Sequence, residues 1–294
     1  MGISAQAFSD SSAATVEQAG RSVVRVEGRR GRPVSGIVWS DNRVVTVAHG
    51  LDGDDAIIGF EDTVMKARVK GVDASTGLAL LAVDGVLPAA KLDDGAALKV
   101  GQLVLRLARP GITVRATSGI ISALGAKPFR AMGGGSIDRW FEIDAAHHAG
   151  FSGGPVVTLE GQVVGLTSTA LVRRTSLVVP TSTIRRVVAQ LEAHGRVRSS
   201  HVGVKMHPVP LPESVRAKTG EEVGLLVIAV EAGSPAATAG LVDGDTVLHL
   251  GDDSVRSLED LYSYLRDDRS GQTVPVTVLR GGEVQKLQVT LGAK

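Results

Sequence analysis

No cysteine occurs among the 294 residues, and aromatic side chains account for only 3% of them. The absence of thiols excludes disulfides, a cysteine nucleophile and a thiolate-bound metal, although a protein without thiols tolerates either redox environment. The scarcity of aromatic residues means that aliphatic side chains must pack the cores. No stretch approaches the ~18 consecutive apolar residues of a membrane-spanning helix, and the first residues do not resemble a signal peptide.

The chain also has no large excess of charge of either sign, because 32 Lys and Arg residues nearly balance 31 Asp and Glu residues. This balance argues against a surface for nucleic acid or for an anionic membrane. The length predicts two domains of ordinary size, each large enough for its own core. The 36 glycines and many short runs of Val, Ile and Leu predict a mainly β chain with tight turns.

The most informative stretch is Gly-Phe-Ser-Gly-Gly-Pro at positions 150–155. The flanking glycines leave the hydroxyl of Ser152 uncrowded and allow backbone turns that a Cβ atom would forbid. Such a turn can aim backbone N–H groups at one point, so the amides of Gly150 and Ser152 are the expected oxyanion hole. A glycine-rich hairpin without chemistry is the alternative interpretation of this motif alone.

A histidine earlier in the chain favours the chemical interpretation. His49 follows the apolar run Val44–Val47, which is typical of a buried strand. An early histidine and a late Gly-x-Ser-Gly-Gly-Pro motif follow the order in which chymotrypsin-type proteases carry these two members of their triad. His49 is therefore the candidate general base and Ser152 the candidate nucleophile.

These motifs and several others together resemble the HtrA (DegP-like) serine proteases. The matching blocks keep the family's order and have similar spacing: Ser35–Val38, Val45–His49, Leu78–Leu81, Thr117–Ser122, Asp144–Ala146 and Gly150–Pro155. The resemblance implies a mainly β fold, with a chymotrypsin-like double β-barrel followed by a PDZ domain, itself a small α+β barrel with two helices. It also implies an endopeptidase that cleaves unfolded or C-terminally recognised proteins through an acyl-enzyme, with no cofactor and no metal.

One position departs from the family's triad. The family places its catalytic Asp immediately before the Leu-Ala-Leu-Leu block, where this chain has Gly77. The missing acid would fix the tautomer of the histidine and stabilise the imidazolium. Three interpretations remain open. Another carboxylate, with Asp73 nearest in sequence, approaches His49; a water or backbone carbonyl orients the ring in a slow protease; or the domain is a pseudoprotease that binds peptides as a scaffold or chaperone.

Two further departures precede the serine. Phe151 stands where the family commonly has a small or polar residue, and His147-His148 stands where it usually has an Asn-Pro type sequence. Adjacent side chains on an extended segment point to opposite faces, so no metal site is predicted at the two histidines. The bulky ring of Phe151 is a second reason to expect reduced activity.

The predicted domains are an N-terminal arm (1–20), a trypsin-like protease domain (21–198) and a PDZ domain (199–294). Apolar spacing predicts a helix over Thr181–His194, with Thr181 or Ser182 as its N-cap and Gly195 as its stop. A glycine-rich stretch over Gly125–Ile137 predicts a loop. By resemblance, residues 166–174 line a specificity pocket for small aliphatic side chains.

The last domain resembles HtrA-type PDZ domains at Gly224–Val227, Ala232–Leu241 and Asp243–Asp245. PDZ domains bind a C-terminal peptide as an added strand, with its carboxylate held by a loop of backbone N–H groups. By resemblance, the loop residues are His201, Val202, Gly203 and Val204, and the wall residues of the groove are Leu258, Leu261 and Leu265. Their helix, Leu258–Arg266, is expected to begin with a capping box formed by Ser257 and Asp260. Contact with another subunit or with the protease is the alternative use of this domain.

The expected partners are unfolded protein or peptide substrates and C-terminal peptides, without nucleic acid and without a membrane span. The family commonly forms trimers, so the resemblance also implies a homotrimer. HtrA-like proteins usually work in the cell envelope, whereas no signal peptide is recognisable in this sequence. The compartment is therefore left open between the cytosol and, for a trimmed chain, the periplasm or cell envelope.

Overall fold

The computed structural model describes residues 4–28, 32–125, 129–130, 136–137, 139–169, 177–198, 200–265 and 269–293. The chain divides into two compact units, Met1–Val197 and Arg198–Lys294. Each unit has its own aliphatic core, as the scarcity of aromatic residues predicts. No helix in the described part of the chain is long and apolar enough to cross a membrane.

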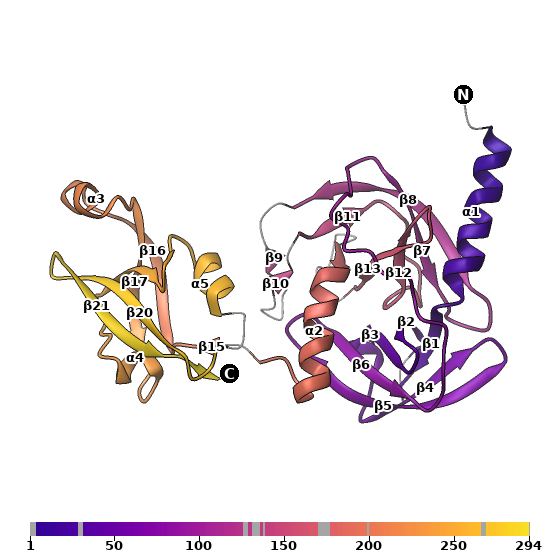
Figure 1. The fold of residues 1–294 in the computed structure, drawn as a ribbon, viewed down its shortest axis with the longest axis horizontal. Helices are drawn as coiled ribbons and strands as arrows, with labels where there is room; N and C mark the ends of the chain where they lie inside the picture. The colour runs from indigo at the N-terminus through magenta and orange to yellow at the C-terminus, as the bar shows by residue number, and fades with distance from the viewer. Residues whose placement is uncertain are drawn as a thin grey trace. The chain divides into compact units, whose positions relative to one another are not determined.

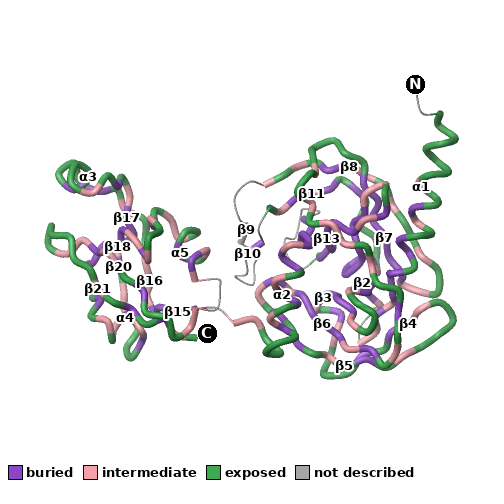
Figure 2. Tube along the Cα trace, in the orientation of Figure 1, coloured by how far each residue is buried: buried purple, intermediate pink, exposed green. Residues whose placement is uncertain are grey.

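The first unit begins with helix α1 (Ala5–Gly20), whose N-cap hydroxyl, on Ser4, accepts a hydrogen bond from the amide of Ala7. Most of α1 is exposed, and its N-terminal part stands away from the strands (Figures 1 and 2). Its buried residues, Thr15 among them, lie toward the C-terminal end. The hydroxyl of Thr15 donates a hydrogen bond to the carbonyl of Leu159 at 2.6 Å, which ties the helix to the second barrel.

Six strands of the first unit close into a barrel in the order β1-β2-β3-β6-β5-β4. Their bounds are β1 (Val23–Glu27), β2 (Val34–Ser40), β3 (Arg43–Val47), β4 (Asp55–Phe60), β5 (Thr63–Asp73) and β6 (Leu78–Val83). Closure pairs every strand on both sides, so the barrel has no free edge. Fully buried side chains such as Ile37, Ile58 and Leu80 fill its interior. After β3 the chain makes the single 3₁₀ turn η1 (Ala48–Gly50), which carries His49.

A second barrel has the order β11-β14-β13-β12-β7-β8. Its strands are β7 (Leu103–Ala108), β8 (Arg115–Leu124), β11 (Phe141–Ile143), β12 (Pro155–Thr158), β13 (Val163–Thr167) and β14 (Leu177–Pro180). The two barrels confirm the expected chymotrypsin-like architecture (Figure 1). Within the predicted loop Gly125–Ile137, β9 (Phe129–Arg130) pairs with β10 (Ser136–Ile137), and positions 126–128 and 131–135 lie outside the described residues.

Helix α2 (Thr181–His194) packs against β5 and β6 of the first barrel and against β13 and β14 of the second. The predicted apolar face is buried, and Gly195 ends the helix in the left-handed conformation, with φ of 68°. The predicted N-cap is wrong, because Pro180 holds that position without a side-chain hydrogen bond. The hydroxyl of Thr181 instead donates to the carbonyl of Val163 on β13 at 3.1 Å. A buried hydroxyl needs a hydrogen-bond partner, and for Thr181 this partner is a carbonyl of the sheet and not an amide of the helix.

The second unit is built on a sheet with the order β16-β17-β18-β20-β21. Its elements are β15 (Ser200–His201), β16 (Val204–Pro210), α3 (Glu213–Thr219), β17 (Val223–Val230), α4 (Pro235–Thr238), β18 (Thr246–Leu250), β19 (Asp253–Ser254), α5 (Leu258–Leu265), β20 (Thr273–Arg280), β21 (Glu283–Thr290) and β22 (Gly292–Ala293). β15 pairs with β22, and β19 pairs with β18.

Two features of this unit frame the predicted peptide groove. Among the described strands, β16 pairs only with β17, so its other edge is open, and α5 packs beside it. Helix α5 begins with the predicted capping box, in which the amide of Asp260 donates to the Ser257 hydroxyl at 3.2 Å and the amide of Ser257 donates to the Asp260 carboxylate at 2.8 Å. The predicted end of this helix, Arg266, lies outside the described residues.

Candidate active site

The Ser152 loop, Ala146–Gly154, connects β11 to β12 on the second barrel. Its backbone has φ of +86° at Gly150 and +83° at Gly153, in the region that only glycine occupies easily. A Cβ atom at Gly153 would also lie 2.0 Å from the carbonyl oxygen of Ser35, which excludes any other residue. The glycine spacing that singled out this motif therefore has a direct structural cause.

The first barrel holds this loop through Ser35 on β2. The Ser35 amide donates to the carbonyl of Ser152 at 2.9 Å, and the Ser35 hydroxyl donates to the carbonyl of Gly150 at 2.7 Å. The carbonyl of Ser35 in turn accepts from the hydroxyl of Thr46 on β3, at 2.7 Å. Because Thr46 precedes His49 on the same strand and turn, these contacts join the segments that carry the two predicted catalytic residues.

The amides predicted to form the oxyanion hole are available. Among the described residues, neither the N–H of Gly150 nor that of Ser152 donates a hydrogen bond to another group. The carbonyls beside them are engaged, since Gly150 and Ser152 accept from Ser35 and the carbonyl of Phe151 accepts from the hydroxyl of Thr167 at 3.1 Å. The loop therefore fixes its carbonyls and leaves both predicted oxyanion donors without an acceptor in the described part of the chain.

Ser152 is largely buried, with 5% of its surface exposed. Its hydroxyl makes a hydrogen bond of 3.1 Å with the hydroxyl of Thr169, just beyond β13. Sequence reasoning missed Thr169 as a partner of the serine. The pairing of β12 with β13 brings the two together across the second barrel, and no local motif marks such a contact.

His49 lies on the turn η1, where burial of its ring lowers its pKa below the ordinary 6.5. No described group makes a hydrogen bond or an ion pair with this imidazole. His147 of the Ser152 loop interacts with it electrostatically. The pKa of His147 is lowered by burial first, and then by the positive charges of Arg106, His148 and His49. An imidazole with a lowered pKa is neutral at pH 7 and able to accept a proton.

Gly77 ends the turn between β5 and β6, and its carbonyl accepts the amide of Ala48 at 2.8 Å. The carboxylate of Asp73, only 4% exposed, is engaged within the same turn. One of its oxygens accepts the amide and hydroxyl of Ser75, and the other accepts the amide and hydroxyl of Thr76. Asp73 therefore stabilises the turn and makes no hydrogen bond to His49.

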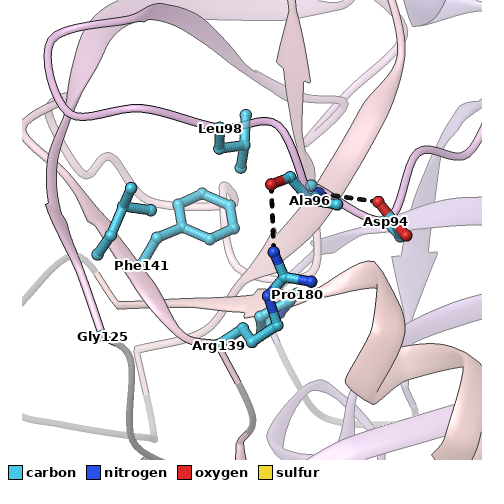
Figure 3. A pocket seen from close by; sticks show the side chains of 9 residues that line it. Asp94, Ala96, Leu98, Gly125, Arg139, Phe141 and Pro180 are labelled. Carbon is cyan, nitrogen blue, oxygen red and sulfur yellow. Dashed lines mark hydrogen bonds between the residues drawn. The ribbon is translucent and has the colours of Figure 1, made fainter.

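Two hollows lie on the second barrel. One, of about 590 Å³, adjoins the Ser152 loop and is lined by Arg115, Ala116, Thr117, His148, Ala149 and Phe151. The other, of about 390 Å³, is lined in part by Leu98 and Phe141 (Figure 3). At its edge the guanidinium of Arg139 donates a hydrogen bond to the carbonyl of Ala96. Neither His49 nor Ser152 lines either hollow. Part of the predicted specificity pocket, residues 170–174, lies outside the described residues.

In the second unit, the predicted carboxylate loop begins at the last residue of the short strand β15. Carbonyls on the loop are engaged, since Val202 accepts from the amide of Ala236 and Gly203 from the amide of Glu231, each at 2.9 Å. The amides of Val202 and Gly203 donate to no other described group. Val204 opens the edge strand β16, and the side chain of His201 lies 3.6 Å from that of Glu231.

The three predicted wall residues on α5 differ in burial. Leu261 is 5% exposed and belongs to the core of the second unit, whereas Leu258 and Leu265 are half-buried at its margin. The half-buried pair is therefore the part of the helix that a guest peptide could contact. In the described part of the chain, no group of three or more His, Asp or Glu side chains is arranged to hold a metal ion.

Comparison with known proteins agrees with both units. Residues 34–166 match the trypsin-like peptidase domain family, and residues 200–291 match the PDZ domain family. A protein of Pseudomonas savastanoi pv. phaseolicola named "Probable periplasmic serine endoprotease DegP-like" is 32% identical over 266 residues, covering 87% of this chain and 55% of that protein. A protein of Brucella suis with the same name is 33% identical over 280 residues, covering 89% and 53%. This chain thus spans about half the length of these relatives.

Two solved structures resemble this chain over nearly its whole length. The HtrA-type protease AlgW, solved with a tripeptide, has a TM-score of 0.81 at 26% identity and covers 96% of this chain and 97% of its own. A serine endoprotease from Yersinia pestis has a TM-score of 0.80 at 24% identity, covering 100% and 99%, and so shows likeness of fold. By its two domains and their order, this chain belongs to the HtrA/DegP-like family, with a trypsin-like peptidase domain followed by a PDZ domain.

Proposed function

We propose that this chain is a serine endopeptidase of reduced activity, which cleaves unfolded or C-terminally recognised proteins. His49 accepts the proton of the Ser152 hydroxyl as that oxygen attacks a peptide carbonyl, and the amides of Gly150 and Ser152 bind the resulting oxyanion. The protonated His49 then donates to the departing amine. Water, activated by the same imidazole, hydrolyses the ester on Ser152.

The observation that carries this proposal is the conformation of the Ser152 loop. Its amides at Gly150 and Ser152 have no other hydrogen-bond acceptor among the described residues, while Ser35 holds the carbonyls of both residues. A preorganised donor of this kind contributes roughly 10²–10³ in kcat, because it needs no reorganisation when charge develops. A surface turn without chemistry would not need two amides kept without partners beside a serine.

Reduced activity is expected because the acid of the triad is missing. Gly77 has no side chain to orient His49, and the carboxylate of Asp73 is engaged by Ser75 and Thr76. Loss of the acid's function in a serine protease lowers kcat by about 10⁴, and the remaining groups still exceed the uncatalysed rate by about 10³–10⁴. We therefore propose a slow enzyme in which His49 and Ser152 act without a third member.

A peptide-binding pseudoprotease is the second candidate. The hydrogen bond between Ser152 and Thr169 favours it where Ser152 is the donor, because the serine proton then points to Thr169 and not to His49. In that case the protease domain and the second unit would hold unfolded chains without cleaving them. The two candidates differ in one property, turnover that depends on Ser152.

Cleavage of casein, an unfolded protein, by the purified chain and by Ser152→Ala separates these candidates. The proposal expects slow cleavage by the unaltered chain and none above background by the variant, with both proteins melting at the same temperature. Equal background rates would rule out the enzyme and leave the scaffold.

For the second unit we propose recognition of C-terminal peptides. The open edge of β16 and the amides of Val202 and Gly203, which have no described acceptor, support this proposal. The names of the DegP-like relatives make the periplasm the compartment we propose. The homotrimer implied by the resemblance stays a prediction, which the mass of the particle in solution tests.

A further inference from the structure

A charged side chain lies inside the second barrel, directly beneath the Ser152 loop. Arg106 interrupts the apolar run of β7 (Leu103–Ala108) and is only 2% exposed. Burial lowers its pKa to about 10, so the guanidinium stays charged at pH 7. Burying such a charge is costly unless it is hydrogen-bonded, and its partners therefore indicate what it is there to hold.

Two of those partners belong to the start of the Ser152 loop. The guanidinium donates to the carbonyl of Ala146 at 3.4 Å and makes a short contact with Nδ1 of His147. Arginine has donors and no acceptor, so Nδ1 of His147 must be the acceptor. This contact keeps His147 neutral, with its proton on Nε2, and the charge of Arg106 contributes to the lowered pKa of His147 after burial itself.

The end of the loop is held by the same group. The guanidinium carbon of Arg106 lies 5.5 Å from the centroid of the Phe151 ring, within the range of a cation–π interaction. Nε of Arg106 donates to the hydroxyl of Thr167 at 3.2 Å, and that hydroxyl donates to the carbonyl of Phe151 at 3.1 Å. Phe151 is 1% exposed, and His148 meets its ring edge-on at 5.6 Å.

We propose that Arg106 is a positioning residue of the active site. It holds both ends of the Ser152 loop, through His147 and Phe151, in the conformation that leaves the amides of Gly150 and Ser152 available. Among the described residues, the hydrogen-bond and ring partners of Arg106 do not include Ser152, so it acts through this loop. The bulky Phe151, a departure from the family pattern, is then the ring against which Arg106 packs. The catalytic part of this inference depends on the proposed function, and the structural part does not.

The side chain of Arg109 gives a matched control. It is also buried, with 6% exposed, and lies just past the end of β7. Its guanidinium donates to the carbonyls of Val23, Gly20 and Ile112, none of which belongs to the Ser152 loop. The backbone amide of Arg109 donates to the hydroxyl of Ser35 at 2.8 Å, and a side-chain substitution keeps this bond. Arg109→Met therefore removes a buried cation and its side-chain hydrogen bonds from the same region, none of which reaches the loop.

Amide hydrogen exchange in the full chain tests the structural part. For Arg106→Met we expect exchange of the peptides covering Ala146–Gly154 to rise about tenfold or more. Loss of the Arg106 contacts lets the loop open, which exposes the hydrogen-bonded amides of Phe151, Gly153 and Gly154. In Arg109→Met those peptides should exchange as in the unaltered protein. Equal exchange in all three proteins, or an equal rise in both variants, would overturn the proposal. The pKa of His147, followed by NMR, should rise in Arg106→Met because a neighbouring positive charge is gone.

Kinetics test the catalytic part. A displaced loop should lower kcat about 10–100-fold in Arg106→Met with KM changed less than about twofold, since misplaced groups affect the transition state more than binding. Arg106→Lys should restore little, because lysine lacks the planar fork that reaches Ala146 and His147 together. If the unaltered chain and Ser152→Ala cleave equally, the proposed function fails, while the exchange result still decides the role of Arg106.

If Arg106→Met does not fold, a second variant tests the same contact. Phe151→Leu removes the ring that Arg106 contacts and keeps an apolar side chain at this buried position. We expect the same rise in exchange over the Ser152 loop. Unchanged loop exchange in both Phe151→Leu and Arg106→Lys would overturn the proposal.

Discussion

The hydroxyl of Ser152 is hydrogen-bonded to the hydroxyl of Thr169, 3.1 Å away. Either hydroxyl can be the donor of this bond. Attack on a substrate requires the Ser152 hydroxyl to donate to His49, so the contact with Thr169 competes with activation when Ser152 is the donor, which is the arrangement we propose. A hydrogen bond of this kind contributes about 0.5–1.5 kcal/mol, equivalent to roughly a 2–10-fold effect on rate. We expect Thr169→Val to raise kcat/KM for a peptide substrate by that factor. Thr169→Ser keeps the hydroxyl and is the control; a fall in rate in Thr169→Val would mean that Thr169 assists the serine.

Restoring the missing acid is the second test. A Cβ atom at Gly77 would meet nothing within 4 Å, so a side chain can begin at this position without a clash. The backbone φ of +69° costs about 1–2 kcal/mol for most residues, and Asp and Asn tolerate it better than others. We expect Gly77→Asp to raise kcat by about 10²–10⁴.

Gly77→Asn is the matched control for this change, since it shares the backbone cost and lacks the charge. Its kcat should stay within roughly tenfold of the unaltered chain, because an amide can orient the ring and cannot stabilise the imidazolium to the same degree. Equal rates in Gly77→Asp and in the unaltered chain would indicate that another group already acts as the acid or that the oxyanion hole is not functional.

The pH dependence of cleavage follows from the lowered pKa of His49. Burial disfavours the imidazolium, so His49 stays neutral to below its ordinary 6.5, and a neutral ring is required of a general base. The acidic limb of the kcat/KM profile should therefore lie below pH 6.5. In Gly77→Asp the nearby carboxylate favours the imidazolium and raises this pKa, so the limb should move to higher pH. Coincident limbs would show that position 77 does not face His49.

Peptide binding by the second unit gives an independent prediction. A peptide with a free C-terminal carboxylate should bind with micromolar affinity, a free energy of about −8 kcal/mol, and should lose most of it when its C-terminus is amidated. Isothermal titration with both peptides measures the difference. Leu265→Glu places a charge on the predicted wall of the groove, so it should weaken binding of both the free-carboxylate and the amidated peptide. Indifference to amidation would contradict the assignment of the carboxylate loop to Val202 and Gly203.

The parts of the structure that the sequence predicted are those encoded by local chemistry. The loop at Gly150–Gly154 requires glycines at fixed spacing, the periodic apolar face of α2 is buried, and Ser257 and Asp260 form a capping box within a single turn. Each of these features depends on residues close together in the chain. Their patterns can therefore be recognised without knowing the fold.

Contacts made across strands could not be predicted in this way. The register of β13 decides that Thr169 reaches Ser152, and the pairing of β7 with β12 brings Arg106 beneath the Ser152 loop. The only signal for Arg106 is a charge within an apolar strand, which marks a buried polar role without naming its partners. The partners of Asp73 are local by contrast, because Ser75 and Thr76 lie only two and three residues further along the chain, and this pattern marks a turn.

Activation of Ser152 by His49 alone is the central claim, and covalent labelling tests it most directly. A fluorophosphonate reacts with a serine only when a base removes its proton, and the adduct is located by mass spectrometry of the digested protein. The account predicts slow labelling at Ser152 in the unaltered chain and at least about 100-fold slower labelling in His49→Ala at pH 7.5, since general-base catalysis contributes about 10²–10⁴. Equal labelling rates in the two proteins, or no adduct at Ser152 in either, would contradict it.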